Sequence, residues 1–195
     1  MWLIAGLGNP GSEYAGNRHN IGFMIVEELR RRSGAGWKEK FSGKFARAAV
    51  GGAEAVLLCP MTFMNLSGHS VQKASAFFGI APEQTLVVHD ELDLPWRTVR
   101  VKQGGGAGGH NGLRSILEQL GSDGFARVRA GIGRPPQGDA EGYVLSNFSA
   151  IERAELPDVL TRGADAAAAV VNRGVTAAMN EFNRRSTDED PETGR

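Results

Sequence analysis

The sequence predicts a single α/β domain, with a mixed, mostly parallel sheet flanked by helices and with further helices at the C-terminal end. Three observations lead to this prediction. Short apolar runs of strand length alternate with longer runs whose apolar residues recur at helical spacing. One pair of strand-like runs is joined by Gly51-Gly52, which indicates an antiparallel hairpin within the sheet. An Ala-rich run near the C-terminus is typical of packed helices.

Three strands and two helices are expected in the first half of the chain. The strands are short runs rich in apolar residues, at residues 2–5, 45–50 and 55–58. The helices carry apolar residues at helical spacing, at residues 21–29 and 66–78. Asn20 is placed to cap the first helix, and Gly34 and Gly36 are placed to end it. Residues 37–44 are expected to form a loop.

The second half continues the alternation of strands and helices. Its expected strands are again short apolar runs, at residues 85–89, 98–101 and 126–132. A third helix is expected at residues 113–120, and the Ala-rich run at 158–185 is expected to form one or two helices. Ser149-Ala150-Ile151-Glu152 has the pattern of a capping box, which marks the start of a helix.

The composition is that of a globular protein. With 195 residues, 41% of them apolar and 23% charged, the chain is long enough to bury one sizeable core. No apolar run is long enough to span a bilayer, and the N-terminus lacks the pattern of a secretion signal. Cys59 is the single cysteine, so no intramolecular disulfide can form. We therefore expect a cytoplasmic protein that does not associate with membranes.

Residues 1–185 are expected to form the domain, and residues 186–195 a disordered acidic tail. The tail holds four acidic residues against Arg195 and contains no apolar residue. Without the tail, basic side chains slightly outnumber acidic ones, although the whole chain balances at 22 of each. This small excess permits a nucleic-acid partner without arguing for one.

A long loop at residues 6–20 joins the first strand to the first helix. It contains Asn9 near its start and His19 near its end, and long loops on a rigid scaffold are often functional. Its first residues fit the spacing G-x-G-x-x-G of a dinucleotide site. Pro10 and Gly16 disfavour the immediate helix that such a site requires, and no acidic residue ends a second strand at the required distance. We therefore disfavour a dinucleotide site.

His19 and Asp90 are the most informative pair of polar residues. Asp90 follows an expected buried strand, and ligands of α/β proteins bind outside the carboxyl ends of the strands. A carboxylate that accepts from one imidazole nitrogen makes the other nitrogen a better base. Plain alternatives exist: His19 could bond to backbone at the helix entry, and Asp90 could cap a turn.

Three asparagines have both a functional and a structural interpretation. Asn9, Asn65 and Asn111 could orient a substrate carbonyl, a water molecule or an oxyanion. Alternatively, Asn65 and Asn111 could be helix N-caps, and Asn9 could set a turn before Pro10.

The Gly-rich loop at residues 104–112 resembles a phosphate cradle but lacks the Lys-Ser/Thr ending of a P-loop. Its glycines more plainly allow flexibility and close approach of the backbone. Lys102, Arg114 and Arg129 lie near this loop in sequence or on a neighbouring strand. Each alone is explained as a solvated charge, and together they could bind a phosphate.

No nucleophilic serine lies in a G-x-S-x-G turn, so a hydrolase of this sequence is expected to use water. A metal is the main alternative. The sequence supplies ligand types suited to zinc, although none has a short metal-binding spacing such as H-E-x-x-H: His19, His89, Asp90, Asp93 and His110.

Four motifs follow one another along residues 2 to 185. The first is Ile4-Ala5-Gly6-Leu7-Gly8-Asn9-Pro10-Gly11, with Tyr14 and Arg18-His19-Asn20 after it. The second is Pro60-Met61-Thr62-Phe63-Met64-Asn65-Leu66-Ser67-Gly68, and the third is His89-Asp90-Glu91-Leu92-Asp93-Leu94. The fourth comprises Lys102 and Gly108-Gly109-His110-Asn111-Gly112-Leu113, extended by Arg129. Together, in this order, the motifs resemble those of bacterial peptidyl-tRNA hydrolase.

This resemblance implies an enzyme that cleaves the ester between a peptide, or an N-blocked amino acid, and the 3′ end of tRNA. It implies that His19 activates water, that Asp90 supports His19, and that Asn9 discriminates N-blocked substrates. The side chains implied to contact the 3′ CCA end, the acceptor stem or the peptide are Tyr14, Phe63, Asn65, His110 and Asn111. Lys102 and Arg129 are implied to hold the tRNA 5′-phosphate. The resemblance further implies a cytoplasmic monomer with no cofactor, no obligatory metal and no obligatory protein partner.

Two hypotheses of other classes stay open at this point. The implied fold is shared with metal-dependent aminopeptidases, so a metallohydrolase is one, and a metal analysis would discriminate. A non-catalytic RNA-binding module is the other, and it would bind tRNA but leave the ester intact.

Overall fold

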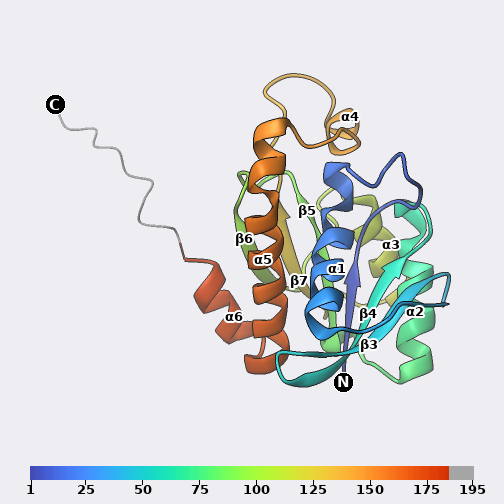
Figure 1. The fold of residues 1–195 in the computed structure, drawn as a ribbon. Helices are drawn as coiled ribbons and strands as arrows, with labels where there is room; N and C mark the ends of the chain where they lie inside the picture. Colours follow the sequence, from blue (N-terminus) through green and yellow to red (C-terminus); the bar gives the residue numbers. More distant parts are fainter. Residues whose placement is uncertain (185–195) are drawn as a thin grey trace.

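The computed structural model describes residues 1–184, and the expected acidic tail at 186–195 lies outside them. Its centre is a seven-stranded sheet with the strand order β2-β3-β4-β1-β5-β7-β6 (Figure 1). The strands are β1 (Trp2–Gly6), β2 (Lys38–Lys40), β3 (Gly43–Val50), β4 (Ala53–Pro60), β5 (Thr85–Glu91), β6 (Val99–Gln103) and β7 (Ala126–Gly131).

The mixed sheet confirms the predicted fold class. Its four central strands, β4, β1, β5 and β7, run parallel to one another, and β3 and β6 run in the opposite direction. The central strands are almost continuously buried because helices cover both of their faces. The hairpin through Gly51-Gly52 is present, with Val50 paired to Ala53.

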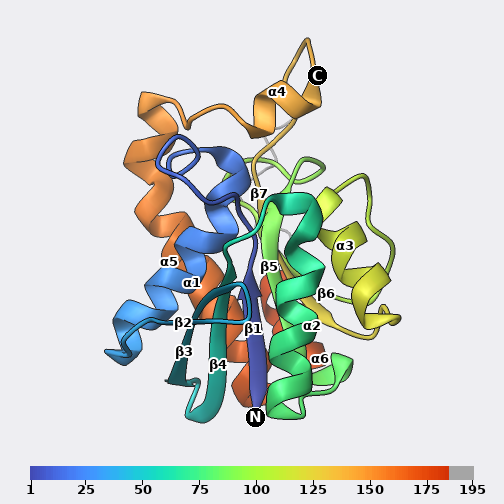
Figure 2. The same cartoon turned by 90° about the vertical axis from the view of Figure 1, so that its right-hand side faces the viewer.

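Helices form one layer on each side of the sheet (Figure 2). The α-helices are α1 (Ile21–Ser33), α2 (Ser67–Phe78), α3 (Asn111–Leu120), α4 (Ala140–Val144), α5 (Ala150–Arg173) and α6 (Val175–Phe182). Helices α1, α5 and α6 pack on one face, and α2 and α3 on the other, so the molecule has two apolar cores. None of the helices in the described part of the chain is long and apolar enough to cross a membrane.

Three features differ from the expectations. Lys38–Lys40 forms the edge strand β2 where a loop was predicted, because its backbone pairs with β3 although its polar side chains carry no strand pattern. Helix α4 was not predicted. Helix α5 begins at Ala150, directly after the Ser149 capping box, and so starts before the expected residue 158.

The order of the strands brings several loops together at the carboxyl ends of the parallel strands. Strand β1 lies between β4 and β5, and their carboxyl ends point to the same side, where α4 lies above them (Figure 1). Helix α1 packs very closely on this part of the sheet, because a Cβ at Gly22 would lie 2.3 Å from the carbonyl oxygen of Val88. This close approach fixes the turn that precedes α1 against the end of β5.

Candidate active site

A cleft of about 580 Å³ lies at the carboxyl ends of the parallel strands. It collects most of the polar and aromatic residues that the sequence singled out: Asn9, His19, Phe63, Asn65, Asp90, His110 and Asn111. These residues come from the ends of three parallel strands and from the start of α3. Helix α4 supplies a further wall through Ala140, Glu141, Val144 and the adjoining Leu145.

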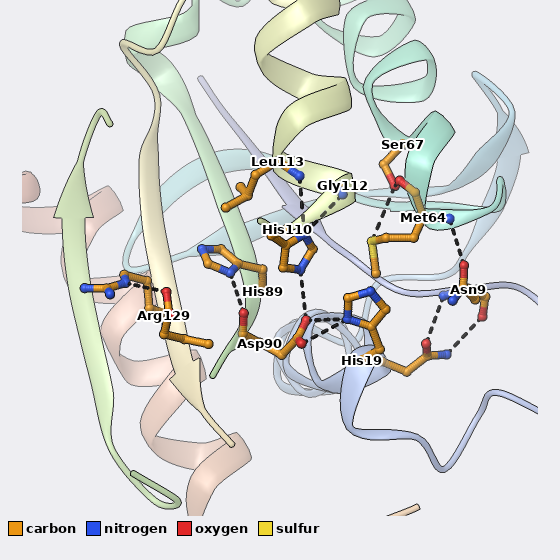
Figure 3. A network of polar contacts seen from close by, with 12 residues as sticks. Asn9, His19, Met64, Ser67, His89, Asp90, His110, Gly112, Leu113 and Arg129 are labelled. Atoms are coloured by element: carbon orange, nitrogen blue, oxygen red, sulfur yellow. Dashed lines mark hydrogen bonds and ion pairs between the residues drawn. The ribbon is translucent and has the colours of Figure 1, made fainter. Parts of the chain in front are cut away.

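His19 and Asp90 form a direct pair at the base of the cleft (Figure 3). His19 lies on a 3-10 turn, Arg18–Asn20, and Asp90 is the penultimate residue of β5. Nδ1 of His19 lies 2.9 Å from each carboxylate oxygen, and both residues are buried. The Asp90 carboxylate therefore contacts an imidazole and does not merely cap a turn.

A second histidine contacts the same carboxylate. Nε2 of His110 lies 2.9 Å from Oδ1 of Asp90, while Nδ1 of His110 accepts from the backbone N–H groups of Gly112 and Leu113 at 3.1 and 3.3 Å. Because Nδ1 accepts two hydrogen bonds, it carries no proton, so His110 is neutral and donates through Nε2. His110 is thereby the N-cap of α3.

Neither Asn20 nor Asn111 caps a helix with its side chain, although Asn20 occupies the predicted N-cap position of α1. Asn111 is the first residue of α3, after its cap. Asn20 precedes α1, but its side chain makes no cap hydrogen bond. Its amide instead accepts from the backbone N–H of Asn9 and donates to the Asn9 carbonyl, both at 2.9 Å. The two ends of the 6–20 loop are thus fastened together.

Burial and hydrogen bonding shift the acidity of the central groups. Burial acts to raise the pKa of Asp90, but His19 and His110 outweigh it and hold this pKa well below its usual range. Asp90 is therefore ionised and can only accept, so Nδ1 of His19 carries a proton. In the neutral tautomer with this proton on Nδ1, the lone pair of His19 lies on Nε2, which makes no hydrogen bond within the described part of the chain. This is the arrangement of a general base.

Asn9 is rigidly held beside this base. Its Oδ1 accepts from the backbone N–H of Met64 at 2.7 Å, and Asn20 fixes its backbone (Figure 3). The Nδ2 donor of Asn9 makes no hydrogen bond within residues 1–184, and Asn9 lines the cleft. Phe63 is 59% exposed, and Asn65 and Asn111 are also exposed at the cleft wall.

Tyr14, Lys102 and Arg129 do not line the cleft. Tyr14 is half-buried within the 6–20 loop. Lys102 and Arg129 lie on β6 and β7, on one face of the sheet, as diagonal neighbours across that strand pair. Arg129 donates through Nε to Glu91 at 3.1 Å, and Lys102 is exposed.

The Gly-rich loop connects this basic pair to the cleft. Strand β6 is antiparallel to β7, so β6 ends beside the start of β7, at the opposite end of the strands from the cleft. Residues 104–109 carry the chain back to His110, and Ala107, Gly108 and Gly109 line the cleft. His110 therefore reaches the cleft through the loop and not from the end of β6.

The possible metal-ligand atoms of His19, Asp90 and His110 lie within 4.8 Å of one another, which is close enough to bind a metal ion. Within residues 1–184 this set does not include His89 or Asp93. The three side chains already satisfy one another by hydrogen bonds, so a metal would have to displace two imidazole protons.

Comparison with known proteins identifies the family. A family model described as peptidyl-tRNA hydrolase matches residues 3–190. The chain belongs to the peptidyl-tRNA hydrolase family. The family resemblance drawn from the four motifs is thereby confirmed, and with it the class of the enzyme, a hydrolase of ester bonds.

Individual members of the peptidyl-tRNA hydrolase family resemble the chain over almost its whole length. A peptidyl-tRNA hydrolase of Sorangium cellulosum is 54% identical over 189 residues, which cover 95% of this chain and 85% of that protein. One of Pseudarthrobacter chlorophenolicus is 47% identical and covers 95% and 97%, respectively. The crystal structure of the Acinetobacter baumannii peptidyl-tRNA hydrolase has a TM-score of 0.88 at 42% identity, covering 95% and 96%.

Sequence reasoning missed several residues that shape this family site. Met64 lines the cleft, and Asn20 holds Asn9 in place, although both lie within the recognised motifs. Arg127, on β7, donates to the carbonyls of Gly105 and Gly106 and so holds the Gly-rich loop. The wall formed by α4 could not have been found, because its five residues are too few to show a helical apolar period.

Proposed function

We propose that this chain hydrolyses the ester bond between a peptide, or an N-blocked amino acid, and the 3′ end of tRNA. It would thereby recycle tRNA from peptidyl-tRNA that dissociates prematurely. The observation that carries the proposal is the imidazole of His19, which is bonded to a buried carboxylate and presents a free nitrogen to a cleft. Because no activated serine or cysteine lines that cleft, water is the nucleophile.

The reaction follows from this geometry as a direct displacement without a covalent enzyme intermediate. Nε2 of His19 takes a proton from water as the water oxygen bonds to the ester carbon. Asp90 accepts from Nδ1 and stabilises the imidazolium that forms. The tetrahedral intermediate then collapses with cleavage of the bond to the tRNA 3′ oxygen, which receives the proton from His19. The products are a free carboxylic acid and tRNA.

Asn9 is proposed to donate through Nδ2 to an oxygen of the substrate. A donor placed before the reaction stabilises charge that develops on the carbonyl oxygen, or holds the acyl group of an N-blocked substrate. The support is its rigidity, since both its side-chain oxygen and its backbone are occupied by protein partners.

The tRNA is proposed to contact two separate regions. The 3′ CCA end and the peptide would enter the cleft past Phe63, Asn65, His110 and Asn111, with Tyr14 in the neighbouring loop. The acceptor stem would extend toward β6 and β7, where Lys102 and Arg129 would hold the 5′-phosphate. Arg129 bonds to Glu91 through Nε alone, which leaves its terminal nitrogens for a phosphate. We further propose that residues 1–185 act as one domain, as a monomer in the cytoplasm.

The test compares N-acetyl-aminoacyl-tRNA with free aminoacyl-tRNA, with and without a chelator, in water enriched in heavy oxygen. We expect hydrolysis of the N-blocked substrate alone, no effect of the chelator, and heavy oxygen in the released acid. Tight tRNA binding without hydrolysis would instead establish an RNA-binding module. Loss of activity with chelator, restored by zinc, would establish a metallohydrolase at His19, Asp90 and His110.

A further inference from the structure

Arg18, the residue before His19, is a buried cation that does not line the cleft. Its exposed fraction is 7%, and its guanidinium points away from the substrate site. Nη1 donates to Oγ of Ser146 at 2.5 Å and to the carbonyl of Asn147 at 2.7 Å. Nη2 donates to Oε2 of Glu152 at 2.6 Å.

The same guanidinium also stacks on an aromatic ring of α4. The Cζ atom of Arg18 lies 4.3 Å from the centre of the Tyr143 ring, within the range of a cation–π contact. The Tyr143 hydroxyl in turn donates to the carbonyl of Ile132 at 2.7 Å, at the start of the loop that leaves β7. Arg18 therefore contacts α4 on the side of the helix that the cleft does not use.

Backbone contacts reinforce the connection between the two segments. The N–H of Arg18 donates to the carbonyl of Ser146 at 3.1 Å, and Asn17 forms an isolated antiparallel bridge with Asn147. The Asn17 side chain also donates to Asn147 at 2.7 Å. The turn that carries His19 is thus joined to residues 143–152, which lie almost the length of the domain away in sequence.

Glu152 has two tasks at this junction. Its Oε2 atom accepts from Arg18, and it also accepts from the backbone N–H of Ser149 at 2.6 Å within the capping box of α5. A capping box needs only an acceptor at this position, which glutamine also supplies. The charge of Glu152 is therefore required by Arg18 and not by the cap. A guanidinium buried without such a partner would be strongly disfavoured.

We propose that Arg18 is a positioning residue that fixes the α4 wall of the cleft relative to His19. Val144 and Leu145 line the cleft, and the residues on either side of them, Tyr143 and Ser146, contact Arg18. Loss of the Arg18 network would leave His19 bonded to Asp90 but would free the wall against which the substrate lies. This inference rests on the proposed function and assigns Arg18 to substrate binding, not to proton transfer.

The experiment compares Arg18→Lys and Glu152→Gln with a matched control, Arg47→Lys. Lysine keeps the charge but cannot form the forked contact, whereas glutamine in place of Glu152 keeps the cap but removes the ion-pair partner. Arg47 forms an ion pair with Glu54 on the exposed β3–β4 hairpin, far from the cleft. The readouts are KM and kcat for N-acetyl-aminoacyl-tRNA, the pH profile of kcat, and backbone amide exchange of residues 140–148.

Breaking a buried ion pair usually costs more free energy than a tenfold change in affinity represents. We therefore expect both test variants to raise KM at least about tenfold. The pH profile of kcat should be unchanged, amide exchange at 140–148 should be faster, and the double variant should fall short of additivity. Arg47→Lys should behave as the unmodified protein. An unchanged KM with faster exchange, or a changed pH profile, would overturn the assignment.

The failure of this inference is distinguishable from failure of the proposed function. If the unmodified protein does not hydrolyse the substrate, the proposed function fails, while amide exchange still reports whether Arg18 holds α4. If the unmodified protein is active and the Glu152→Gln variant, folded by circular dichroism, exchanges and binds normally, the positioning role of Arg18 is wrong.

Discussion

Two histidines share one carboxylate, and their outer nitrogens make them chemically different. His110 uses its outer nitrogen, Nδ1, to cap α3, so that atom is occupied by backbone donors. His19 leaves its outer nitrogen, Nε2, open to the cleft. Since a base must have a free lone pair, the proposed mechanism uses His19 as the base, and His110 holds Asp90 by a hydrogen bond.

At the same residue scale, His19→Ala should abolish ester hydrolysis while leaving the fold intact. The loss should reach the upper part of the roughly 10²–10⁴-fold range that a positioned general base supplies. The measurement is single-turnover hydrolysis of N-acetyl-aminoacyl-tRNA, with circular dichroism as the control for folding. Near-normal turnover by a correctly folded variant would remove His19 from the mechanism.

Asp90→Asn should slow hydrolysis by on the order of 10²-fold or more and change the pH–rate profile near neutrality. Asp90 accepts hydrogen bonds from two imidazole N–H groups, whereas asparagine offers one accepting oxygen and a donating amide. One of the two histidines must then lose its partner or change its tautomer. The pH–rate profile of kcat checks this expectation, and an unchanged profile would show that Asp90 does not support His19.

At the scale of elements, the Gly-rich loop is held by a buried arginine beneath it. The guanidinium of Arg127 donates to the Gly105 carbonyl and, at 2.6 Å, to the Gly106 carbonyl. Burial lowers the pKa of this guanidinium, an effect that neighbouring Arg129 strengthens. The two carbonyl acceptors offset part of the free-energy cost of burying this guanidinium. The same hydrogen bonds couple the loop to β7, and the loop in turn places His110 at the start of α3.

Strands β6 and β7 are the elements on which tRNA binding should be tested. Replacing Lys102 or Arg129 by alanine should raise KM for tRNA with a 5′-phosphate and leave kcat nearly unchanged, because neither residue reaches the cleft. The salt dependence of binding should become shallower by roughly one released counterion per lost contact. Lys38→Ala is the matched control, since β2 lies at the opposite edge of the sheet.

A minimal substrate without the tRNA body separates binding from chemistry in the same variants. We expect Lys102→Ala and Arg129→Ala to hydrolyse it as well as the unmodified protein does. Equal losses on the full-length and minimal substrates would place these two residues in the catalytic centre, and the proposed division between cleft and phosphate site would fail.

At the scale of the whole molecule, the buried His89 should make stability depend on pH. Burial is the main cause that lowers the pKa of His89 from 6.5 to about 3. Below pH 6.5 the unfolded chain takes up a proton on His89 that the folded protein does not accept until about pH 3. Stability should therefore fall as the pH drops through this interval, by up to about 1.4 kcal/mol per pH unit. Asp90 acts in the same direction at still lower pH.

Denaturant unfolding at a series of pH values between neutrality and pH 4 measures this dependence. His89→Asn keeps a donor for the Asp90 carbonyl, which His89 Nδ1 contacts at 2.7 Å, but has no group that takes up a proton. The variant should show a flatter dependence of the unfolding free energy on pH. Equal slopes for the two proteins would mean that His89 is not the group responsible.

Much of the fold could be predicted from local patterns, and the misses have physical causes. The strands at 85–89 and 126–132 were recovered because short, mostly apolar runs mark them, and the helix at 66–78 because its apolar residues recur at helical spacing. Strand β2 was missed because its sequence is polar, and helix α4 was missed because five residues are too few to show a helical period. Both elements form because of what they pair or pack with. Asn20 occupies the predicted N-cap position of α1, but its side chain bonds to the distant backbone of Asn9 instead of capping the helix.

The sequence by itself determined the fold class, the family and the identities of the side chains that meet in the cleft, since motifs and periodicities are local properties. Only the tertiary structure decided how those side chains divide their tasks. The contact between His19 and Asp90 spans 71 positions, and the contact between Arg18 and Glu152 spans 134. Which nitrogen of each histidine is free, and which carboxylate neutralises Arg18, depend on partners that the order of the strands brings together. No local pattern in the sequence encodes that order.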